Sequence, residues 1–240
     1  MADLVVLGED GPWQRLPPEA VLAAKEAGLD DAPYVFAIRG LSPDTVHRVL
    51  AHEHGLVRQD HGKQPQVFRW DAVMRTRESV VDHYRTESGV RRYSQTRFSF
   101  TLTREDGAKV KIAGSDHREA SASAPFGGPA SATVQNHRYF EFGKSACAGV
   151  ARAQLPGALA TLERGDEVAF GPVRLTRDGL RRRLRRPVAW DGLTVEVDGG
   201  WITLRDREGR TAFKESVADV PNSTLFRTLL TRLARPDAQG

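Results

Sequence analysis

The sequence predicts a mainly β protein of the α+β class, made of two related domains in tandem, each closed by a C-terminal helix. Three observations support this prediction: an internal repeat, a series of short strand-like segments, and a helical pattern at the end of each copy. The chain has 240 residues, of which 40% are hydrophobic and 28% are charged. These proportions are ordinary for a globular protein, and the length suits one large domain or two small ones.

The internal repeat consists of two motifs that occur in the same order in both halves of the chain. The first is Gly-Leu, a polar stretch and then Trp-Asp, at residues 55–71 and again at residues 179–191. The second is a strand, a charged turn that ends in glycine and another strand, at residues 98–112 and 200–213. Because glycine accepts a positive φ, such turns are typical of β-hairpins. The order of the motifs predicts two related domains.

The second copy predicts seven short strands followed by one amphipathic helix. The strands are expected at residues 167–170, 173–177, 180–183, 187–190, 194–197, 201–204 and 211–213. The helix is expected over residues 222–234, with Asn222 as its cap, because leucines recur there at helical spacing. Seven strands and a closing helix are the order of a pleckstrin-homology-like (PH-like) domain, a bent antiparallel β-sandwich. Trp70 and Trp190 are expected to be buried at equivalent places in the two domains.

The first copy is longer and carries a long central hairpin. Its arms are expected at residues 74–84 and 92–103, with the tip at 86–89, and a helix over 139–163 closes the copy. Residues 114–137 are rich in Ser, Ala, Gly and Pro, and are expected to form a disordered surface loop.

The domain boundaries follow from these segments. Residues 1–45 hold a short helix at 18–28 and a strand at 34–39, and form an N-terminal extension packed on the first domain. The first PH-like domain is expected at residues 46–163 and the second at residues 164–240.

The motifs also resemble those of a bacterial family of tandem PH-like proteins of unknown function. The resemblance rests on turns and core tryptophans and covers residues 47–112 and 139–233. The matching segments are Gly55-Leu56, Phe68-Arg69-Trp70-Asp71, Asp82-His83-Tyr84, Phe100-Thr101-Leu102-Thr103-Arg104, Asp178-Gly179-Leu180, Trp190 and Val220-Pro221-Asn222. The resemblance implies the tandem fold, and its motifs carry no catalytic residue.

Nothing in the sequence predicts a cofactor. A single cysteine, Cys147, excludes an internal disulfide and a cysteine-based zinc site. Its small-residue surroundings favour a buried thiol over a reactive one. The segment Phe142–Ser145 matches the tail of a P-loop, but Arg138 stands where that motif needs its first glycine.

Three histidines near one predicted turn are the candidate metal ligands. His52 and His54 would share one face if both lay on a strand, and His61 follows across the hairpin. A zinc site needs three or four converging ligands. Surface histidines around a turn are the simpler interpretation, and no metal is predicted.

A cluster of arginines at one predicted hairpin tip is the candidate anion site. Its members are Arg181, Arg182, Arg183, Arg185 and Arg186. Like charges this close repel one another unless an anion or an acidic partner offsets them. A solvated turn is the alternative interpretation, because the chain is rich in arginine throughout: 6 of its 35 basic residues are lysine, which leaves 29 arginines.

The leading functional hypothesis is a non-catalytic binding or adaptor protein that acts through protein–protein contacts of its tandem PH-like domains. The alternative is a peripheral protein that binds an anionic lipid headgroup or a phosphate ligand through residues 181–186. An enzyme is the third hypothesis, and it ranks last because the sequence contains no recognisable catalytic motif. Nucleic acid is not favoured as a partner, since Trp190 and Trp201 near the cluster look like core residues.

The expected location is the cytoplasm, or the membrane periphery. The longest apolar runs are about five residues, far short of the roughly 20 that a membrane-spanning helix needs. The first residues also lack the basic start of a secretory signal.

Overall fold

The computed structural model of the chain describes residues 4–6, 17–29, 34–39, 46–60, 62–116, 130–182 and 187–234. In this part of the chain the fold is mainly β, with several antiparallel sheets and three α-helices, as the sequence predicts. Among these residues, no helix combines the length and the apolar character needed to cross a membrane.

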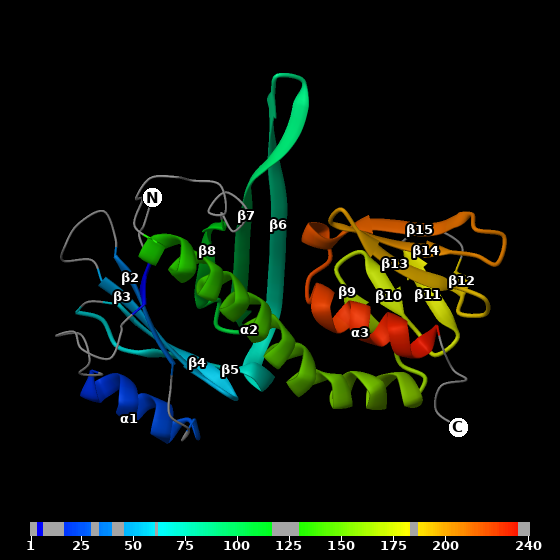
Figure 1. The fold of residues 1–240 in the computed structure, drawn as a ribbon. Helices are drawn as coiled ribbons and strands as arrows, with labels where there is room; N and C mark the ends of the chain where they lie inside the picture. The colour runs from blue at the N-terminus through cyan, green and yellow to red at the C-terminus, as the bar shows by residue number, and fades with distance from the viewer. Residues whose placement is uncertain are drawn as a thin grey trace.

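The first half of the chain contains two antiparallel sheets and a long helix (Figure 1). The first sheet holds β1 (Leu4–Val6), β2 (Tyr34–Arg39), β3 (Val46–His52), β4 (Gly55–Asp60) and β5 (Gln66–Arg69). The second sheet, which we call the central sheet, holds β6 (Val73–Glu87), β7 (Val90–Arg104) and β8 (Lys109–Asp116). The helices are α1 (Pro18–Glu26) and α2 (Ala130–Glu163).

The second half repeats this order on a smaller scale. A four-stranded sheet holds β9 (Val168–Phe170), β10 (Val173–Leu175), β11 (Gly179–Arg182) and β12 (Val188–Ala189). A three-stranded sheet holds β13 (Thr194–Asp198), β14 (Trp201–Arg205) and β15 (Thr211–Ser216), and α3 (Ser223–Leu233) follows. These bounds lie within three residues of those expected from the sequence.

The two Trp-Asp motifs occupy matching places in their sheets. Gly55 pairs with the residue directly before Trp70, and Gly179 pairs with the residue directly before Trp190. Each indole N–H donates to a backbone carbonyl upstream of its glycine, at 2.8 Å for Trp70 and 3.1 Å for Trp190. A Cβ at either glycine would meet the backbone of the facing strand, so only glycine fits. The predicted burial of both tryptophans is confirmed.

The charged turns of the second motif also match. Gly107 and Gly209 have φ values of 81° and 77°. Each donates its N–H to the carbonyl three residues earlier, that of Arg104 at 3.1 Å and that of Asp206 at 2.9 Å. The positive φ explains why both turns end in glycine.

The predicted loop at residues 114–137 is wrong at both ends. Strand β8 continues through Asp116, and helix α2 begins at Ala130, nine residues before the predicted start. Gly114 pairs with Phe98 of β7, and a Cβ at this position would lie 2.9 Å from the Phe98 ring. The glycine therefore marks a close approach within the strand and does not mark a loop. Alanine at the start of α2 favours helix, which a composition-based loop assignment overlooks. Residues 117–129 lie outside the described residues.

The N-terminal segment is part of the first sheet instead of an extension packed on it. Strand β2 pairs with β3 along its whole length, and β1 pairs with β2. The boundary that we placed at residue 46 therefore separates paired strands. Helix α1 buries Ala20 and Ala24 against Leu50 and Val57 of the same sheet.

The two halves share helix α2. Cys147 and Val150 lie in the hydrophobic core of the first half, whereas Ala151 and Leu162 lie in that of the second. The helix changes direction in its C-terminal part (Figure 1), where Pro156 cannot donate a backbone hydrogen bond. One continuous helix thus joins both cores.

A polar junction fixes α3 against β6. Asn222 precedes α3 with a positive φ of 53°, and its side chain does not cap the helix as predicted. The side chain instead accepts from the N–H of Thr76 at 2.5 Å and donates to the carbonyl of Met74. The cap comes from Glu78 of β6, whose carboxylate accepts from the backbone N–H of Thr224.

Candidate binding face on the central sheet

The central sheet has one buried face and one exposed face, because side chains alternate along each strand. On β7, Phe98, Phe100 and Leu102 are buried, and the rings of Phe98 and Phe140 of α2 lie 5.2 Å apart. Helix α2 therefore covers this inner face. The intervening positions of β6, β7 and β8 form the outer face, on the opposite side from α2.

The outer face is strongly basic. Seven of its side chains are cationic and exposed, and we call this surface the basic face. They are Arg75, Arg77 and Arg85 of β6, Arg92 and Arg97 of β7, and Lys109 and Lys111 of β8. Glu87, at the far end of β6, is the one carboxylate at the outer positions of these strands, which the structure describes in full. The basic face therefore has a large excess of positive charge.

The strand register places four of these cations in two rows across the sheet. Arg75 lies opposite Thr103, which lies opposite Lys109. Arg77, Thr101 and Lys111 form the next row. With strands about 4.8 Å apart and same-face residues about 6.8 Å apart, the four cations mark a rectangle of about 10 by 7 Å. The threonine hydroxyls between them can donate hydrogen bonds to an anion.

None of the seven cations forms an ion pair with any residue that the structure describes. Elsewhere in the described chain cations are often neutralised, as Arg69 is by Asp71 at 2.7 Å and Arg104 by Asp106. In these pairs the hydrogen bond from the guanidinium lowers the pKa of the carboxyl group of Asp71 and of Asp106. On the basic face Arg85 lies directly opposite Arg92, and like charges placed so are destabilising. An anionic ligand would relieve this repulsion.

The corresponding face of the second half is not basic. There Arg205 of β14 pairs with Glu196 of β13 at 2.8 Å, and Lys214 lies 4.7 Å from the centre of the Trp201 ring. The expectation that Trp201 is a core residue is wrong, because its side chain is 45% exposed on this face. Both cations are engaged within the sheet. Among the described residues, the excess of cations without an ion pair is thus a property of the first half and is not found on the matching sheet of the second half.

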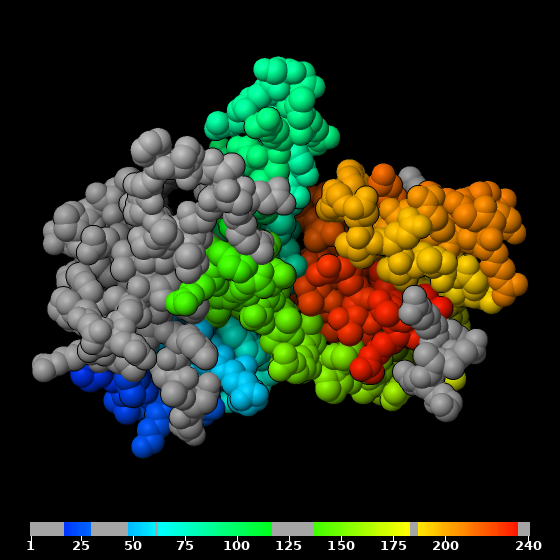
Figure 2. Space-filling model, viewed as in Figure 1, coloured from blue at the N-terminus to red at the C-terminus, as the bar shows by residue number. Residues whose placement is uncertain are grey.

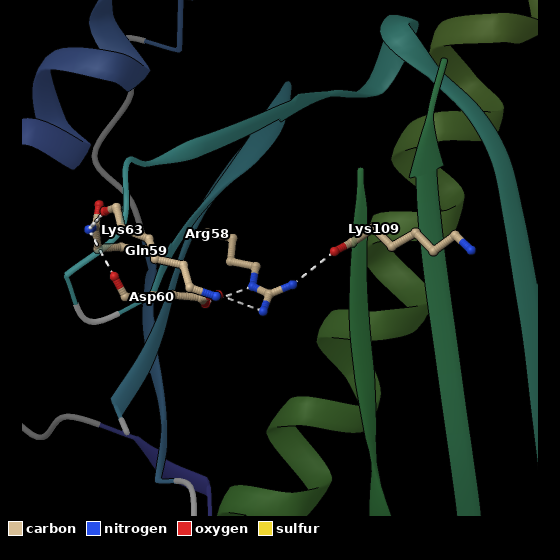
Figure 3. Close-up of polar contacts among 5 residues, drawn as sticks. All are labelled: Arg58, Gln59, Asp60, Lys63 and Lys109. Atoms are coloured by element: carbon tan, nitrogen blue, oxygen red, sulfur yellow. Dashed lines mark hydrogen bonds and ion pairs between the residues drawn. The ribbon is translucent and has the colours of Figure 1, made fainter. Parts of the chain in front are cut away.

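The two rows that contain Arg75, Arg77, Lys109 and Lys111 form the base of the basic face. Contacts with the first sheet hold this base in place (Figure 3). Arg58 of β4 donates to the carboxylate of Asp60 with two hydrogen bonds of 2.8 Å and to the carbonyl of Lys109 at 2.9 Å. Gln59, which lies between Arg58 and Asp60, donates to the carbonyl of Lys63 at 2.6 Å and so supports the chain just after β4. The carbonyl of Lys109 points toward Arg58, and its side chain extends the other way (Figure 3). The start of β8 is therefore fixed while its ammonium group stays exposed.

Beyond β8 the central sheet continues as a two-stranded ribbon. Asp116 is the last residue of β8 and pairs with Thr96, so residues 83–95 of β6 and β7 pair only with each other. The tip of this ribbon projects beyond the other labelled elements of the molecule (Figures 1 and 2). Tyr84 and Tyr93 support it with an edge-to-face contact of 6.1 Å, and the guanidinium of Arg91 lies 4.0 Å from the Tyr84 ring.

The arginine cluster predicted from the sequence is placed only in part. Arg181 forms an ion pair with Glu167 at 2.6 Å, and Arg182 forms one with Glu215 at 3.1 Å. Arg183, Arg185 and Arg186 lie outside the described residues. The two described members of the cluster are thus neutralised within the molecule.

The candidate metal ligands do not share a strand face. His52 ends β3 and is buried, whereas His54 is exposed in the turn that follows, and His61 lies outside the described residues. Within the described residues, no group of three or more histidine, cysteine or carboxylate side chains could hold a metal ion.

The remaining motif residues have structural places. Cys147 is buried, and burial raises the pKa of its thiol far above the usual range. The P-loop-like segment lies inside α2, where Gly143 packs so closely on the ring of Phe100 that a Cβ would overlap it.

Comparisons with protein-family models, with curated proteins and with solved structures gave no match. The basic face could not be recognised from a local pattern, because its cations are separated along the chain. The available signal was the alternation of basic or hydroxyl residues with buried residues, as in Lys109-Val110-Lys111, in strands expected to form one sheet.

Proposed function

We propose that this chain is a non-catalytic binding protein of two tandem PH-like units, and that its basic face recognises an anionic macromolecule. The observation that carries the proposal is the set of seven exposed cations on one face of the central sheet, none of which forms an ion pair with a described residue. The order of four strands, three strands and a closing helix in the second half supports the PH-like assignment. The single cysteine is in keeping with a reducing compartment such as the cytoplasm.

Electrostatics favours the basic face over the cluster that the sequence suggested. Arg181 and Arg182 already have carboxylate partners, so an anion would have to displace Glu167 and Glu215. The basic face offers its cations without such competition. Its guanidinium and hydroxyl groups can donate hydrogen bonds to phosphate, sulfate or carboxylate oxygens.

Retention on an immobilised polyanion tests the proposal. We would compare the salt concentration at which wild type and R77E/K111E elute from a heparin column. Both positions flank Thr101, so the double substitution inverts one complete row of the basic face. The matched control is R152E/R232E, which changes the net charge equally at exposed positions of α2 and α3.

We expect R77E/K111E to elute at a much lower salt concentration than wild type, and R152E/R232E to elute at a salt concentration close to that of wild type. Equal losses in both variants would show that net charge alone governs retention and would contradict the proposal. Circular dichroism and thermal unfolding of each variant establish that the fold is intact.

A further inference from the structure

We infer that the partner of the basic face is a B-form DNA duplex, with phosphates along the base of the face and the β6–β7 ribbon in the major groove. This inference rests on the proposed function and names the anionic macromolecule. It is carried by three features of the central sheet, whose strands the structure describes in full: the spacing of its cations, the shape of the ribbon, and the absence of tryptophan, phenylalanine and leucine from the outer positions.

The donors at the base of the face suit a phosphate backbone. Arg75 and Arg77 of β6 lie about 6.8 Å apart, since same-face residues of a strand are separated by two rises. Successive phosphates of one DNA strand advance 3.4 Å along the axis and are also rotated about it, so neighbouring phosphates lie about 7 Å apart in space and the two arginines match adjacent phosphates. Thr101 and Thr103 lie between these arginines and the lysines of β8. Hydroxyls, arginines and lysines make most protein contacts to DNA phosphates.

The ribbon has the shape that a major groove accepts. A B-form major groove is about 12 Å wide and admits a two-stranded antiparallel ribbon, whereas the major groove of duplex RNA is too narrow for side chains to read. The outer arm of β6, from His83 to Glu87, has no partner strand other than β7. Arg85 and Arg92 lie side by side on this arm, where they can reach phosphates or guanine edges.

Single-stranded nucleic acid fits the face less well. Proteins that bind single strands stack bases on exposed aromatic rings. Within residues 73–116, all of which the structure describes, the outer positions hold no phenylalanine, tyrosine or tryptophan. The tyrosines of the ribbon, Tyr84 and Tyr93, lie on its other side and contact each other.

An anionic membrane and an acidic protein are also poorer matches. Helices and hairpins that anchor to membranes insert tryptophan, phenylalanine or leucine. The exposed apolar residues on the outer positions are Val81, Ala113 and Val90, which are small, and the one longer apolar side chain beside them is Met74, 51% exposed at the β6 bulge. Protein interfaces centre on buried aromatic anchors, which this face does not present.

Fluorescence anisotropy with a labelled 20-base-pair DNA duplex tests the inference. The same sequence is measured as single-stranded DNA and as duplex RNA, and binding to phosphatidylserine vesicles is measured separately. The slope of log K against log salt is about −0.9 per phosphate neutralised. If the four cations at the base of the face (Arg75, Arg77, Lys109 and Lys111) each neutralise one phosphate, the expected slope is about −3.6, and if all seven cations do so it is about −6. Raising salt from 50 to 200 mM should therefore weaken binding by about 10² to 10⁴-fold.

Three results are expected together. Duplex DNA binds at least ten times more tightly than the single strand or duplex RNA, R77E/K111E lowers the slope by about 2, and R152E/R232E does not change it. R85A/R92A, at the ribbon, weakens binding to duplex DNA and leaves binding to duplex RNA unchanged.

Equal affinity for DNA duplex, single strand and RNA duplex would overturn the inference and leave the proposed function standing. Binding to vesicles without binding to duplex DNA or heparin would overturn the inference and also contradict the proposed function, because a lipid surface is not a macromolecule. If neither duplex DNA nor heparin binds, both the inference and the proposed function fail.

Discussion

The carboxylate of Glu78 should be the main polar contribution to the junction between the two halves. Three hydrogen bonds end on its Oε1, from the Ser223 hydroxyl at 2.7 Å, the Thr224 N–H at 3.1 Å and the Thr224 hydroxyl at 2.6 Å. Arg227 lies 3.7 Å from the other oxygen. The side chains of Glu78 and Ser223 are both buried. Glu78→Ala leaves these donors without their acceptor.

The cost of Glu78→Ala follows from these contacts. A hydrogen bond to a charged group contributes about 1.5–3 kcal/mol net, but removing the carboxylate also removes the cost of burying its charge. We expect a loss of about 3–5 kcal/mol in the free energy of unfolding, because three hydrogen bonds to the charged carboxylate are lost and the buried Ser223 hydroxyl is left without its acceptor. Glu78→Gln keeps an acceptor oxygen but loses the charge at the helix N-terminus, so we expect about 1–2 kcal/mol.

Urea unfolding and amide hydrogen exchange together measure the effect. Exposed Glu87 on the same strand supplies the control, and Glu87→Ala should change stability by less than about 0.5 kcal/mol. Glu78→Ala should also speed exchange at the Thr224 amide, which donates to this carboxylate. A Glu78→Ala protein as stable as the Glu87→Ala protein, with the Thr224 amide still protected, would refute this reasoning.

Three other predictions concern buried positions. Trp70→Ala and Trp190→Ala should each lower the free energy of unfolding by about 3–5 kcal/mol in urea titrations, and a harmless substitution at either would contradict the matched placement of the tryptophans. Gly143→Ala should destabilise α2 because a Cβ overlaps the facing ring, whereas Gly157→Ala in the same helix has open space and should stabilise the protein by about 0.5–1 kcal/mol. Because burial raises the pKa of Cys147, its thiol should resist iodoacetamide at pH 9 until the protein unfolds. The unfolded thiol ionises near pH 8.5 and the folded one does not, so stability should fall above that pH in wild type but not in Cys147→Ala, and rapid native labelling would argue against burial.

The second half of the chain was predictable because its signals are local. Glycines at 199, 200 and 209 mark turns with positive φ, so each strand between them was bounded by residue type. The leucines of α3 recur with helical spacing, and Leu225, Leu229 and Leu230 are buried as the pattern indicates.

The start of α2 and the place of β2 were predicted less well, because both depend on distant partners. Small residues at 130–136 read as loop by composition, yet they begin a helix. Strand β2 was recognised, but its pairing with β3 depends on register that the sequence does not state.

The candidate site was harder to predict than the fold. The basic face joins residues from 75 to 111 on three strands, and a bulge between Val73 and Arg75 sets which residues of β6 point outward. A shift of one residue would turn Arg75 and Arg77 inward and Thr76 outward. The Glu78–Ser223 contact spans 145 residues, so no local pattern contains it.

Lysine footprinting tests the central claim, that the basic face binds an anionic macromolecule, most directly. The chain has six lysines, and Lys109 and Lys111 lie on the basic face. The others are Lys25, Lys63, Lys144 and Lys214. Acetylation would be measured residue by residue by mass spectrometry, with and without heparin or duplex DNA. The proposal predicts protection of Lys109 and Lys111 and unchanged labelling of the other four, whereas uniform protection, or protection centred on Lys214, would contradict it.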